Sequence, residues 1–503
     1  MRVVNVMNFV RRIDERKEIS YEPMFQTTKR ELELVNEYGL DNTFLLQYDA
    51  LIDPNYQKLF KEKATERTEL GLWYEIVEPL TTACGMPYNS AYGWKWDWHI
   101  VPGFSMAYSP AERERLIDQA MGKFKEIFGY YPKTVASWLI DTHTINYLTS
   151  HYDISALAIC RDQLSTDAYT LVGGYFNQAY YPCKKNVFTP AQSAEERINV
   201  PIFRLLGPCP LHNYESRKYI SEEQKGIVGC YTMEPVWPMG YTSESVDWYF
   251  KTTFENEDLG FSYVHLGQEN SFGISKEIIK PLLMQLDLLK KYPQAKVMKM
   301  GDAGEAFKAS YPEKTPATCV AGLTNWDTED FQSVYYDCQK YTANIARFEE
   351  QLFLRSLFLF DERVAEHYLT ETCTTFDAVY ENQPLINNAQ WVGRERTKNF
   401  GLLIDTEATP FTAEKSGEGC LKIAWNDKSV IFSEDGITVT AETLTLRLGE
   451  PTAEIALKGN TLSYTYNGNR YGLRIENATV APCEGGYTIQ TKDGQCALIP
   501  EIQ

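Results

Sequence analysis

Throughout the region before residue 313, short apolar segments end in polar or charged side chains. This arrangement is typical of a (β/α) barrel, in which side chains pack the interior and the loops after the strands build the active site. It therefore predicts an enzyme. The segments and the residues at their ends are VVNVMNFV with Arg11, Arg12 and Asp14; NTFLLQYDA with Gln47 and Asp49; ELGLWYEIVE with Glu75 and Glu78; TVASWLIDTHT with Asp141 and His143; ISALAICRDQ with Arg161 and Asp162; INVPIFRLLG with Arg204; and FSYVHLGQEN with Gln268, Glu269 and Asn270.

Amphipathic helical segments alternate with these predicted strands. Residues 27–39, 109–129 and 275–293 place apolar side chains at helical spacing, and each ends at Gly or Pro. Strands separated by helices pair in parallel through right-handed crossovers. Residues 1–312 are therefore predicted to form a (β/α)8-type barrel, whose last strand ends near Asp302.

The pattern of the chain changes from about residue 313. Alternation of apolar and polar residues indicates strands, and Asn-Gly or Asp-Gly turns separate several of them. We expect residues 313–395 to hold connecting strands and one long helix over 341–367, and residues 396–503 to form an antiparallel β-sandwich. The predicted fold class is α/β: a (β/α)8-type barrel with a C-terminal antiparallel β-sandwich domain.

Composition excludes several classes of partner. The net charge of −19 argues against nucleic acid, because phosphate binding needs a basic surface. An anionic substrate would need local arginines. We find no run of about 18 apolar residues that predicts a membrane span, and no apolar signal segment before the first strand. We therefore expect no membrane partner and a cytoplasmic protein, with secretion still open. The 11 cysteines form no C-x-x-C pair, which favours reduced side chains.

Two strand ends carry candidate catalytic groups. Asp14 follows the first strand, where it serves catalysis or, alternatively, forms a surface ion-pair cluster with its neighbours. Asp141 and His143 are spaced i, i+2, so on a strand they project from one face. An imidazole suits general-base work, and a nearby carboxylate orients it and keeps it basic. The alternative is a structural histidine beside a capping Asp141.

Further polar residues are candidates for substrate binding. Arg204 ends an apolar strand, and a guanidinium can bind a carboxylate through two hydrogen bonds. Arg161 is the second candidate for that task, and either arginine could instead neutralise Asp162 or Glu269. Gln268, Glu269 and Asn270 could hydrogen-bond to hydroxyl or N-acyl groups, or could instead be ordinary structure at the rim of the barrel. The further substrate-binding candidates are Asn8, Gln47, Asp141 and Asn325.

Two insertions, residues 84–108 and 230–248, are rich in tryptophan. Flat aromatic rings stack on the C–H faces of sugars, so these insertions are natural walls for a carbohydrate substrate. The alternative is that they pack as lids or at a dimer interface. The rings concerned are Trp94, Trp96, Trp98, Trp237 and Trp248.

Motifs of several other enzyme classes are absent from the sequence. No H-x-x-x-H or H-E-x-x-H supplies paired metal ligands on a helix, and no T-F-D-D-G supplies the usual ligands of a metal-dependent polysaccharide deacetylase. The G-x-S-x-G, P-loop and dinucleotide motifs are absent as well. The sequence therefore predicts no metal site and no cofactor.

With Asp14 after the first strand, His143 in a D-T-H context and a barrel followed by β-rich segments, the chain resembles the inverting exo-sialidases of glycoside hydrolase family 156. The resemblance covers nearly the full length. It implies that Asp14 is the general acid and that His143 is the base that activates water. It also implies sialylated glycans or free sialic acid as ligands, and a homodimer. We assign Arg204 to the sialic acid carboxylate on chemical grounds.

Two other functions stay open from the sequence. A different barrel carbohydrate enzyme, deacetylase-like or mannosidase-like, would use Asp49 or Glu75 as its carboxylates. A non-catalytic glycan-binding protein would use the tryptophan-rich insertions. Inhibition by a chelator would identify the deacetylase-like enzyme, whereas binding without turnover would identify the binding protein.

Overall fold

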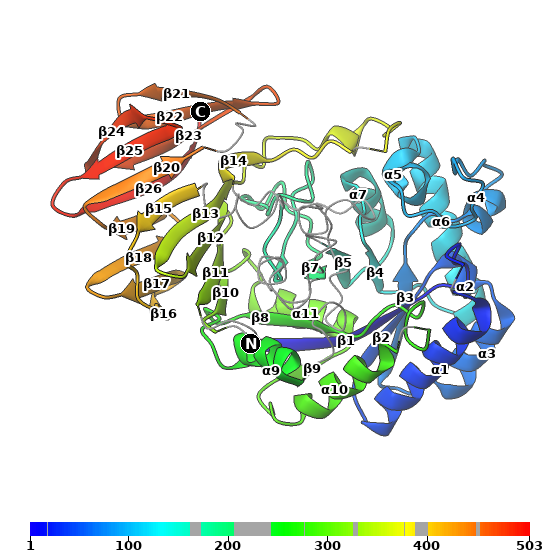
Figure 1. Ribbon diagram of the computed structural model, residues 1–503. Helices are drawn as coiled ribbons and strands as arrows, with labels where there is room; N and C mark the ends of the chain where they lie inside the picture. Colours follow the sequence, from blue (N-terminus) through cyan, green and yellow to red (C-terminus); the bar gives the residue numbers. More distant parts are fainter. Residues whose placement is uncertain are drawn as a thin grey trace.

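The chain folds into two kinds of architecture, a mixed α/β part followed by a part made of antiparallel sheets (Figure 1). Both parts are seen in a computed structural model of the protein. The structure describes residues 1–17, 19–160, 173–205, 243–275, 277–324, 330–376, 378–387, 401–448 and 453–503.

A parallel sheet that curves into a nearly closed, barrel-like shape forms the centre of the α/β part. Its order is β7-β5-β4-β3-β2-β1-β8, so β1 to β5 lie side by side in sequence order, β7 follows β5, and β8 lies on the other side of β1. All pairings in this order are parallel. The strands are β1 (Arg2–Val10), β2 (Asn42–Leu46), β3 (Thr68–Trp73), β4 (Thr134–Ser137), β5 (Ala156–Cys160), β7 (Ile202–Leu205) and β8 (Ser262–Leu266), with β6 (Ala179–Tyr180) antiparallel beside β7 and β9 (Lys296–Val297) parallel to β1.

Helices between the strands cover the outside of the sheet (Figure 1). The helix α6 shows why they form where they do, because Ser109 and Glu112 make a capping box at its start and Gly129 ends it with φ +86°. The longer helices are α1 (Tyr21–Glu37), α3 (Pro54–Lys63), α6 (Pro110–Phe128), α7 (Thr142–His151), α9 (Ser243–Phe254), α10 (Ile279–Leu289) and α11 (Met300–Ser310), and the shorter ones are α2 (Tyr48–Leu51), α4 (Glu78–Ala83), α5 (Ile100–Gly103) and η1 (Ser105–Ala107).

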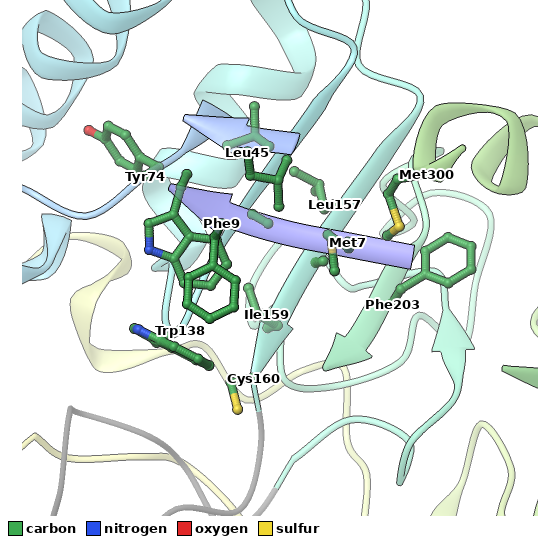
Figure 2. Close-up of a cluster of buried hydrophobic side chains, with 14 of the residues drawn as sticks. Met7, Phe9, Leu45, Tyr74, Trp138, Leu157, Ile159, Cys160, Phe203 and Met300 are labelled. Atoms are coloured by element: carbon green, nitrogen blue, oxygen red, sulfur yellow. The ribbon is translucent and has the colours of Figure 1, made fainter. Parts of the chain in front are cut away.

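Apolar side chains fill the inside of the barrel-like sheet (Figure 2). Phe9 of β1 stacks on Trp73 of β3 with ring centroids 4.2 Å apart, and Trp138 packs edge-on against Phe9 at 4.8 Å. Met7 and Leu157 belong to the same buried cluster. Because this interior is packed with apolar groups, polar groups that meet a ligand are confined to the strand ends.

Two antiparallel sheets share one hydrophobic core in the second part of the chain. Leu354 and Leu446 of one sheet and Val430 and Leu498 of the other belong to this core. The first sheet contains β10 (Thr318–Gly322), β11 (Phe331–Asp337), β12 (Tyr341–Phe348), β13 (Gln351–Leu359), β14 (Gln383–Asn387), β15 (Gly401–Asp405), β20 (Thr443–Arg447), β24 (Ala478–Cys483) and β25 (Gly486–Thr491), and the second contains β16 (Thr412–Gly417), β17 (Cys420–Trp425), β18 (Lys428–Ser433), β19 (Gly436–Thr440), β21 (Glu454–Lys458), β22 (Thr461–Tyr466), β23 (Asn469–Glu476) and β26 (Gln495–Ile502).

The prediction of one long helix over residues 341–367 is wrong. Most of this segment forms the antiparallel pair β12 and β13, which turns at Glu349 with φ +56°. Nearly every residue of both strands is buried, so the alternation of polar and apolar residues that marks a half-exposed strand is lost. The expected last barrel strand is also shorter than predicted, because β9 has two residues and Asp302 lies on α11.

Residues between β13 and β14 return from the β-rich part to the barrel (Figure 1). We call this stretch, residues 361–376 and 378–382, the return segment. Arg113 of α6 donates hydrogen bonds to the carbonyl oxygens of Tyr368 and Glu371, and the Cys373 N–H donates to the Met106 carbonyl oxygen at 2.8 Å. The return segment therefore forms part of the packing around α6.

Candidate functional site

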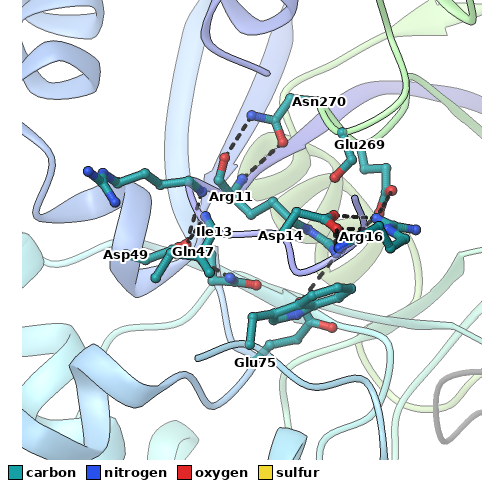
Figure 3. A network of polar contacts seen from close by, with 12 residues as sticks. Arg11, Ile13, Asp14, Arg16, Gln47, Asp49, Glu75, Glu269 and Asn270 are labelled. Carbon is teal, nitrogen blue, oxygen red and sulfur yellow. Dashed lines mark hydrogen bonds and ion pairs between the residues drawn. The ribbon is translucent and has the colours of Figure 1, made fainter. Parts of the chain in front are cut away.

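Acidic and basic side chains from neighbouring strand ends meet in one buried group (Figure 3). Arg11 follows β1 and lies 2.7 Å from Glu269, which follows β8. Its guanidinium also lies 3.8 Å from Asp14 and 3.8 Å from Glu75, which follows β3. Arg16 donates from Nε to Asp14 at 2.8 Å and lies 3.3 Å from Glu269. We call these five residues the charged cluster.

Aromatic rings enclose the charged cluster. The guanidinium of Arg11 lies 4.1 Å from the centroid of the Trp96 ring. Trp73 and Trp96 donate hydrogen bonds to Glu75 Oε2 at 3.0 and 3.3 Å. No carboxylate of the cluster has more than 6% of its side chain exposed, so its ion pairs act in a medium of low dielectric constant, where they are stronger than in water.

Arg16 is the member of the charged cluster most accessible to solvent, with 26% of its side chain exposed. Its guanidinium lies 4.2 Å from the Phe272 ring. Burial lowers the pKa of Arg16, but the hydrogen bond to Asp14 and the attraction of Glu269 outweigh burial and raise the pKa above its ordinary value. Arg16 thus supplies a permanent positive charge at the solvent side of the cluster.

Asp49 and Asn270 hold the backbone that carries Arg11. Asp49 accepts hydrogen bonds from the N–H groups of Arg12 and Ile13 at 3.0 and 2.6 Å. Asn270 accepts from the Arg11 N–H at 3.1 Å and donates to the Arg11 carbonyl oxygen at 2.8 Å. Burial raises the pKa of Asp49, and these backbone hydrogen bonds oppose the rise. Asp49, a candidate catalytic carboxylate from sequence, here supports the loop after β1.

Gly267 allows the end of β8 to approach β1 closely enough to place Glu269 beside Arg11. Its φ is +106°, and a Cβ at this position would lie 2.0 Å from the carbonyl oxygen of Met7. Only glycine adopts this backbone conformation without strain and leaves room for the neighbouring strand.

Gly267→Ala is expected to destabilise the protein by more than the ~1–3 kcal/mol of the backbone conformation alone, because the methyl group also meets β1. Gly260→Ala is the matched control, since Gly260 has φ +108° and nothing lies within 4 Å of the place that its methyl group would take. Urea unfolding of the two variants measures the difference. Equal losses would show that the approach of β8 to β1 tolerates a side chain.

The predicted substrate-binding residues Asn8, Gln47 and Gln268 are fully buried near the strand ends. Asn8 Oδ1 accepts from the Gln268 N–H at 3.1 Å, and Gln268 donates to Glu31 of α1 at 2.8 Å. Gln47 donates to Asp49 at 3.2 Å. The first two contacts join β1, the end of β8 and α1, and the third supports Asp49.

The prediction that Asp141 and His143 share one face of a strand is wrong, because these residues lie at the start of a helix. Asp141 is the N-cap of α7 and accepts from the Thr144 N–H at 3.0 Å. It also forms a buried ion pair with Arg113 at 3.0 Å. His143 Nε2 lies 3.1 Å from Glu114 on α6. Within the described residues, no hydrogen bond or ion pair joins His143 to Asp14.

Arg204 is fully buried in β7, where Nη2 donates to the Cys160 carbonyl oxygen at 2.9 Å and the guanidinium lies 5.7 Å from the Phe188 ring. These contacts place it beside β5. Arg161 and Asn325, the other predicted ligand-binding residues, lie outside the described residues.

Glu366 of the return segment is a buried acid that the sequence did not single out. It accepts from the Thr142 N–H at the start of α7 at 2.7 Å. Burial, together with the negative charge of Asp141 and more weakly of Glu381, raises the pKa of Glu366 to about 8, whereas the hydrogen bonds from Thr142 lower it.

The raised pKa of Glu366 predicts a pH-dependent stability. Between its ordinary pKa of 4.5 and about 8, the folded protein holds a proton that the unfolded chain has released. Stability therefore falls as pH rises through this range. Glu366→Gln keeps an oxygen acceptor for the Thr142 N–H and is expected to flatten this part of the stability–pH curve, measured by urea unfolding at pH 5 and pH 8. An unchanged slope would contradict the prediction.

The described residues contain neither a metal-binding group nor a membrane-spanning helix. No three His, Cys, Asp or Glu side chains among them are grouped so that they could hold a metal ion. None of the helices in the described stretches combines the length and apolar character needed to cross a membrane.

The sequence placed Asp14 and Glu269 at strand ends and offered an ion-pair cluster of Asp14 with its neighbours as an alternative, but that cluster was expected at the surface and Arg16 was not singled out. A signal was present, because R-R-I-D-E-R puts arginines on both sides of Asp14 directly after a buried strand. A loop that begins at a strand end can fold both arginines back onto the carboxylate between them.

Comparisons with known proteins identify relatives of the fold. Residues 80–318 match a family model described as a domain of unknown function with a solved structure, DUF3863. No curated protein matches the chain.

Solved structures provide further likenesses. One is a putative glycoside hydrolase/deacetylase from Parabacteroides distasonis, with a TM-score of 0.56 and 14% identity over 79% of this chain and 93% of that one. Another is a putative polysaccharide deacetylase from Mycobacterium smegmatis, with a TM-score of 0.37 and 10% identity over 62% of this chain and 93% of that one. At such identities, the first likeness shows a shared fold.

Proposed function

We propose that the chain is a carbohydrate-active enzyme that cleaves a glycosidic bond at the charged cluster. The observation that carries this proposal is the meeting of Asp14, Glu75 and Glu269, from three strand ends, around two arginines. Glycosidic cleavage uses a pair of carboxyl groups, one to protonate the leaving oxygen and one to assist the attack at the sugar. The name of the Parabacteroides protein, which shares the fold, agrees with this class.

Within this class we propose inverting exo-sialidase activity on sialylated glycans. Arg11 and Arg16 are the guanidinium groups at this site, and both already pair with carboxylates of the cluster. An anionic sugar would therefore have to replace one of these carboxylates, and the 26% exposed Arg16 is the arginine placed for it. Asp14 would donate the proton; this role comes from the family resemblance and not from its contacts, which are ion pairs with Arg11 and Arg16. His143 would be the base, but its contact with Glu114 on α6 offers this role less support. Arg204 as the carboxylate clamp is part of the same proposal.

Proton NMR of the reaction with 3′-sialyllactose tests both levels of the proposal. Inverting hydrolysis of this α-linked sugar releases the β-anomer of free sialic acid first. Release of the α-anomer first would reject inversion. A parallel panel of neutral aryl glycosides covers other sugars, so cleavage confined to that panel would reject the sialidase while retaining the glycosidase.

The same NMR spectra test the deacetylase-like alternative, which the name of the Parabacteroides protein also includes. An N-acetylated chito-oligosaccharide serves as the probe. Release of acetate without cleavage of any glycoside would reject glycosidic cleavage in favour of deacetylation. No turnover of any probe by the folded protein would reject an enzyme of either kind acting on these sugars.

A further inference from the structure

A partly exposed group of aromatic rings lies on the loop after β3. The rings of Tyr92, Trp94, Trp98 and His99 form successive pairs with centroids 4.6 to 5.4 Å apart. Phe376 of the return segment lies 4.9 Å from His99. Tyr92 is 55% exposed and Phe376 is 49% exposed. We call these five residues the aromatic shelf.

The buried carboxylate of Asp97 fixes the orientation of the His99 ring in the aromatic shelf. Asp97 Oδ1 lies 2.5 Å from His99 Nδ1 and accepts from the His99 N–H at 3.0 Å. Ser90 donates to the other oxygen of Asp97 at 2.9 Å. Asp97 has 0% of its side chain exposed, whereas His99 has 26%. Across the described stretches, no hydrogen bond reaches His99 Nε2, so this nitrogen can bond to a ligand.

Trp96 lies between the aromatic shelf and the charged cluster and contacts both. Trp96 packs on Arg11 and donates to Glu75, and its ring centroid lies 5.7 Å from that of Trp98 in the shelf. A second link joins the same loop to the segment after β1, because the Lys95 N–H donates to Glu15 at 2.8 Å. The aromatic shelf is therefore separated from the charged cluster by the single buried ring of Trp96.

The charge around the aromatic shelf restricts its ligand. Asp97, Glu15 and Glu78 are acidic, and Lys95, 4.0 Å from Glu78, is the basic residue among them. This local excess of negative charge disfavours a phosphate or a carboxylate. A neutral ligand with one flat apolar face and hydroxyl groups at its edge fits both the rings and the free nitrogen of His99.

We infer that the aromatic shelf binds a neutral pyranose unit of the substrate. The C–H face of the sugar stacks on the exposed rings, and a hydroxyl group bonds to His99 Nε2. The inference rests on the proposed function, because it takes the charged cluster as the place where the glycosidic bond breaks. It adds that the substrate is an oligosaccharide, with one sugar at the arginines and a neutral sugar on the shelf.

Saturation-transfer NMR tests this binding site with lactose, cellotetraose and N-acetylchitotetraose as probes. The protein is the full chain carrying Asp14→Asn, so that binding is observed without turnover. We expect transfer to the ring protons of at least one probe. Trp94→Ala and Phe376→Ala in this background should each raise its Kd roughly tenfold, the size of one lost stacking contact.

Tyr130→Ala is the matched control, because Tyr130 is 47% exposed but precedes β4 and so lies at the opposite end of the barrel. It should leave the Kd unchanged. No transfer to any probe, or equal binding by Trp94→Ala and Tyr130→Ala, would overturn the inference. Binding that depends on the shelf in a native chain that cleaves no glycoside would instead reject the proposed function and keep the shelf as a sugar-binding site.

Discussion

Asp14→Asn is expected to lower kcat by roughly 10²–10⁴-fold on a glycoside that the native chain cleaves, because general acid catalysis contributes a factor of that size. The asparagine has the same shape but no acidic proton. It keeps one oxygen that can accept from Arg16 Nε, which donates to Asp14 at 2.8 Å. The loss should therefore appear in initial rates measured at equal concentrations of folded protein.

Substrates with different leaving groups distinguish two roles for Asp14: protonating the departing glycosidic oxygen, or only positioning the substrate. A nitrophenyl leaving group departs with little help from an acid, so the variant should lose much less activity on that glycoside than on a sugar–sugar linkage. Equal losses on both would assign Asp14 a positioning role. Glu22→Gln, on the exposed face at the start of α1, is the control and should leave both rates unchanged.

Arg11→Met is expected to give the largest loss of stability, about 3–5 kcal/mol. Methionine keeps much of the apolar side chain that packs on Trp96 but removes the charge. Asp14, Glu75 and Glu269 would then lie close together without the guanidinium that pairs with all three, and Arg16 would still pair with Asp14 and Glu269. Urea unfolding followed by tryptophan fluorescence measures the change.

Two further variants separate loss of charge from loss of packing. Arg12→Met is the neighbouring control: Arg12 pairs with Asp53, has 46% of its side chain exposed, and should change stability by no more than about 1 kcal/mol. Adding Glu269→Gln to Arg11→Met should recover part of the loss, because it removes one of the carboxylates that had paired with Arg11. Additive losses would show that Arg11 does not stabilise Glu269 electrostatically.

The arrangement of the barrel-like sheet could be predicted from sequence because its strands are buried on both faces. β1 and β8 are mostly apolar and buried along nearly their whole length, and Asp14 and Glu269 follow where these strands end. The same rule predicted that strand ends would gather polar groups in one place. The α/β character of the first part and the β-rich character of the second are confirmed in this way.

The rule fails where a strand end is also the start of a helix. Asp141 and His143 are two residues apart, but a single N-cap hydrogen bond from Thr144 to Asp141 turns the chain into α7. Spacing i, i+2 then no longer means a shared face. The D-T-H-T sequence carries the signal for this outcome, because Asp is a preferred N-cap residue.

Long-range contacts account for the rest of what the sequence did not predict. Arg11 joins Glu269 across 258 positions of the chain, and no local pattern encodes such a partner. Gly267 shows the same limit, since an isolated glycine after a strand predicts a turn but not the approach of Met7. The site therefore depends on packing between strands that are distant in sequence.

The return segment has a consequence for how the chain can be divided. A gene fragment that stops at residue 312 would encode β1 to β9 but would omit the carbonyl oxygens of Tyr368 and Glu371, to which the fully buried Arg113 donates. It would also expose Thr142, whose N–H is bonded to Glu366. Recombination or truncation at that point leaves an incomplete barrel, so the two parts are expected to be inherited and expressed together.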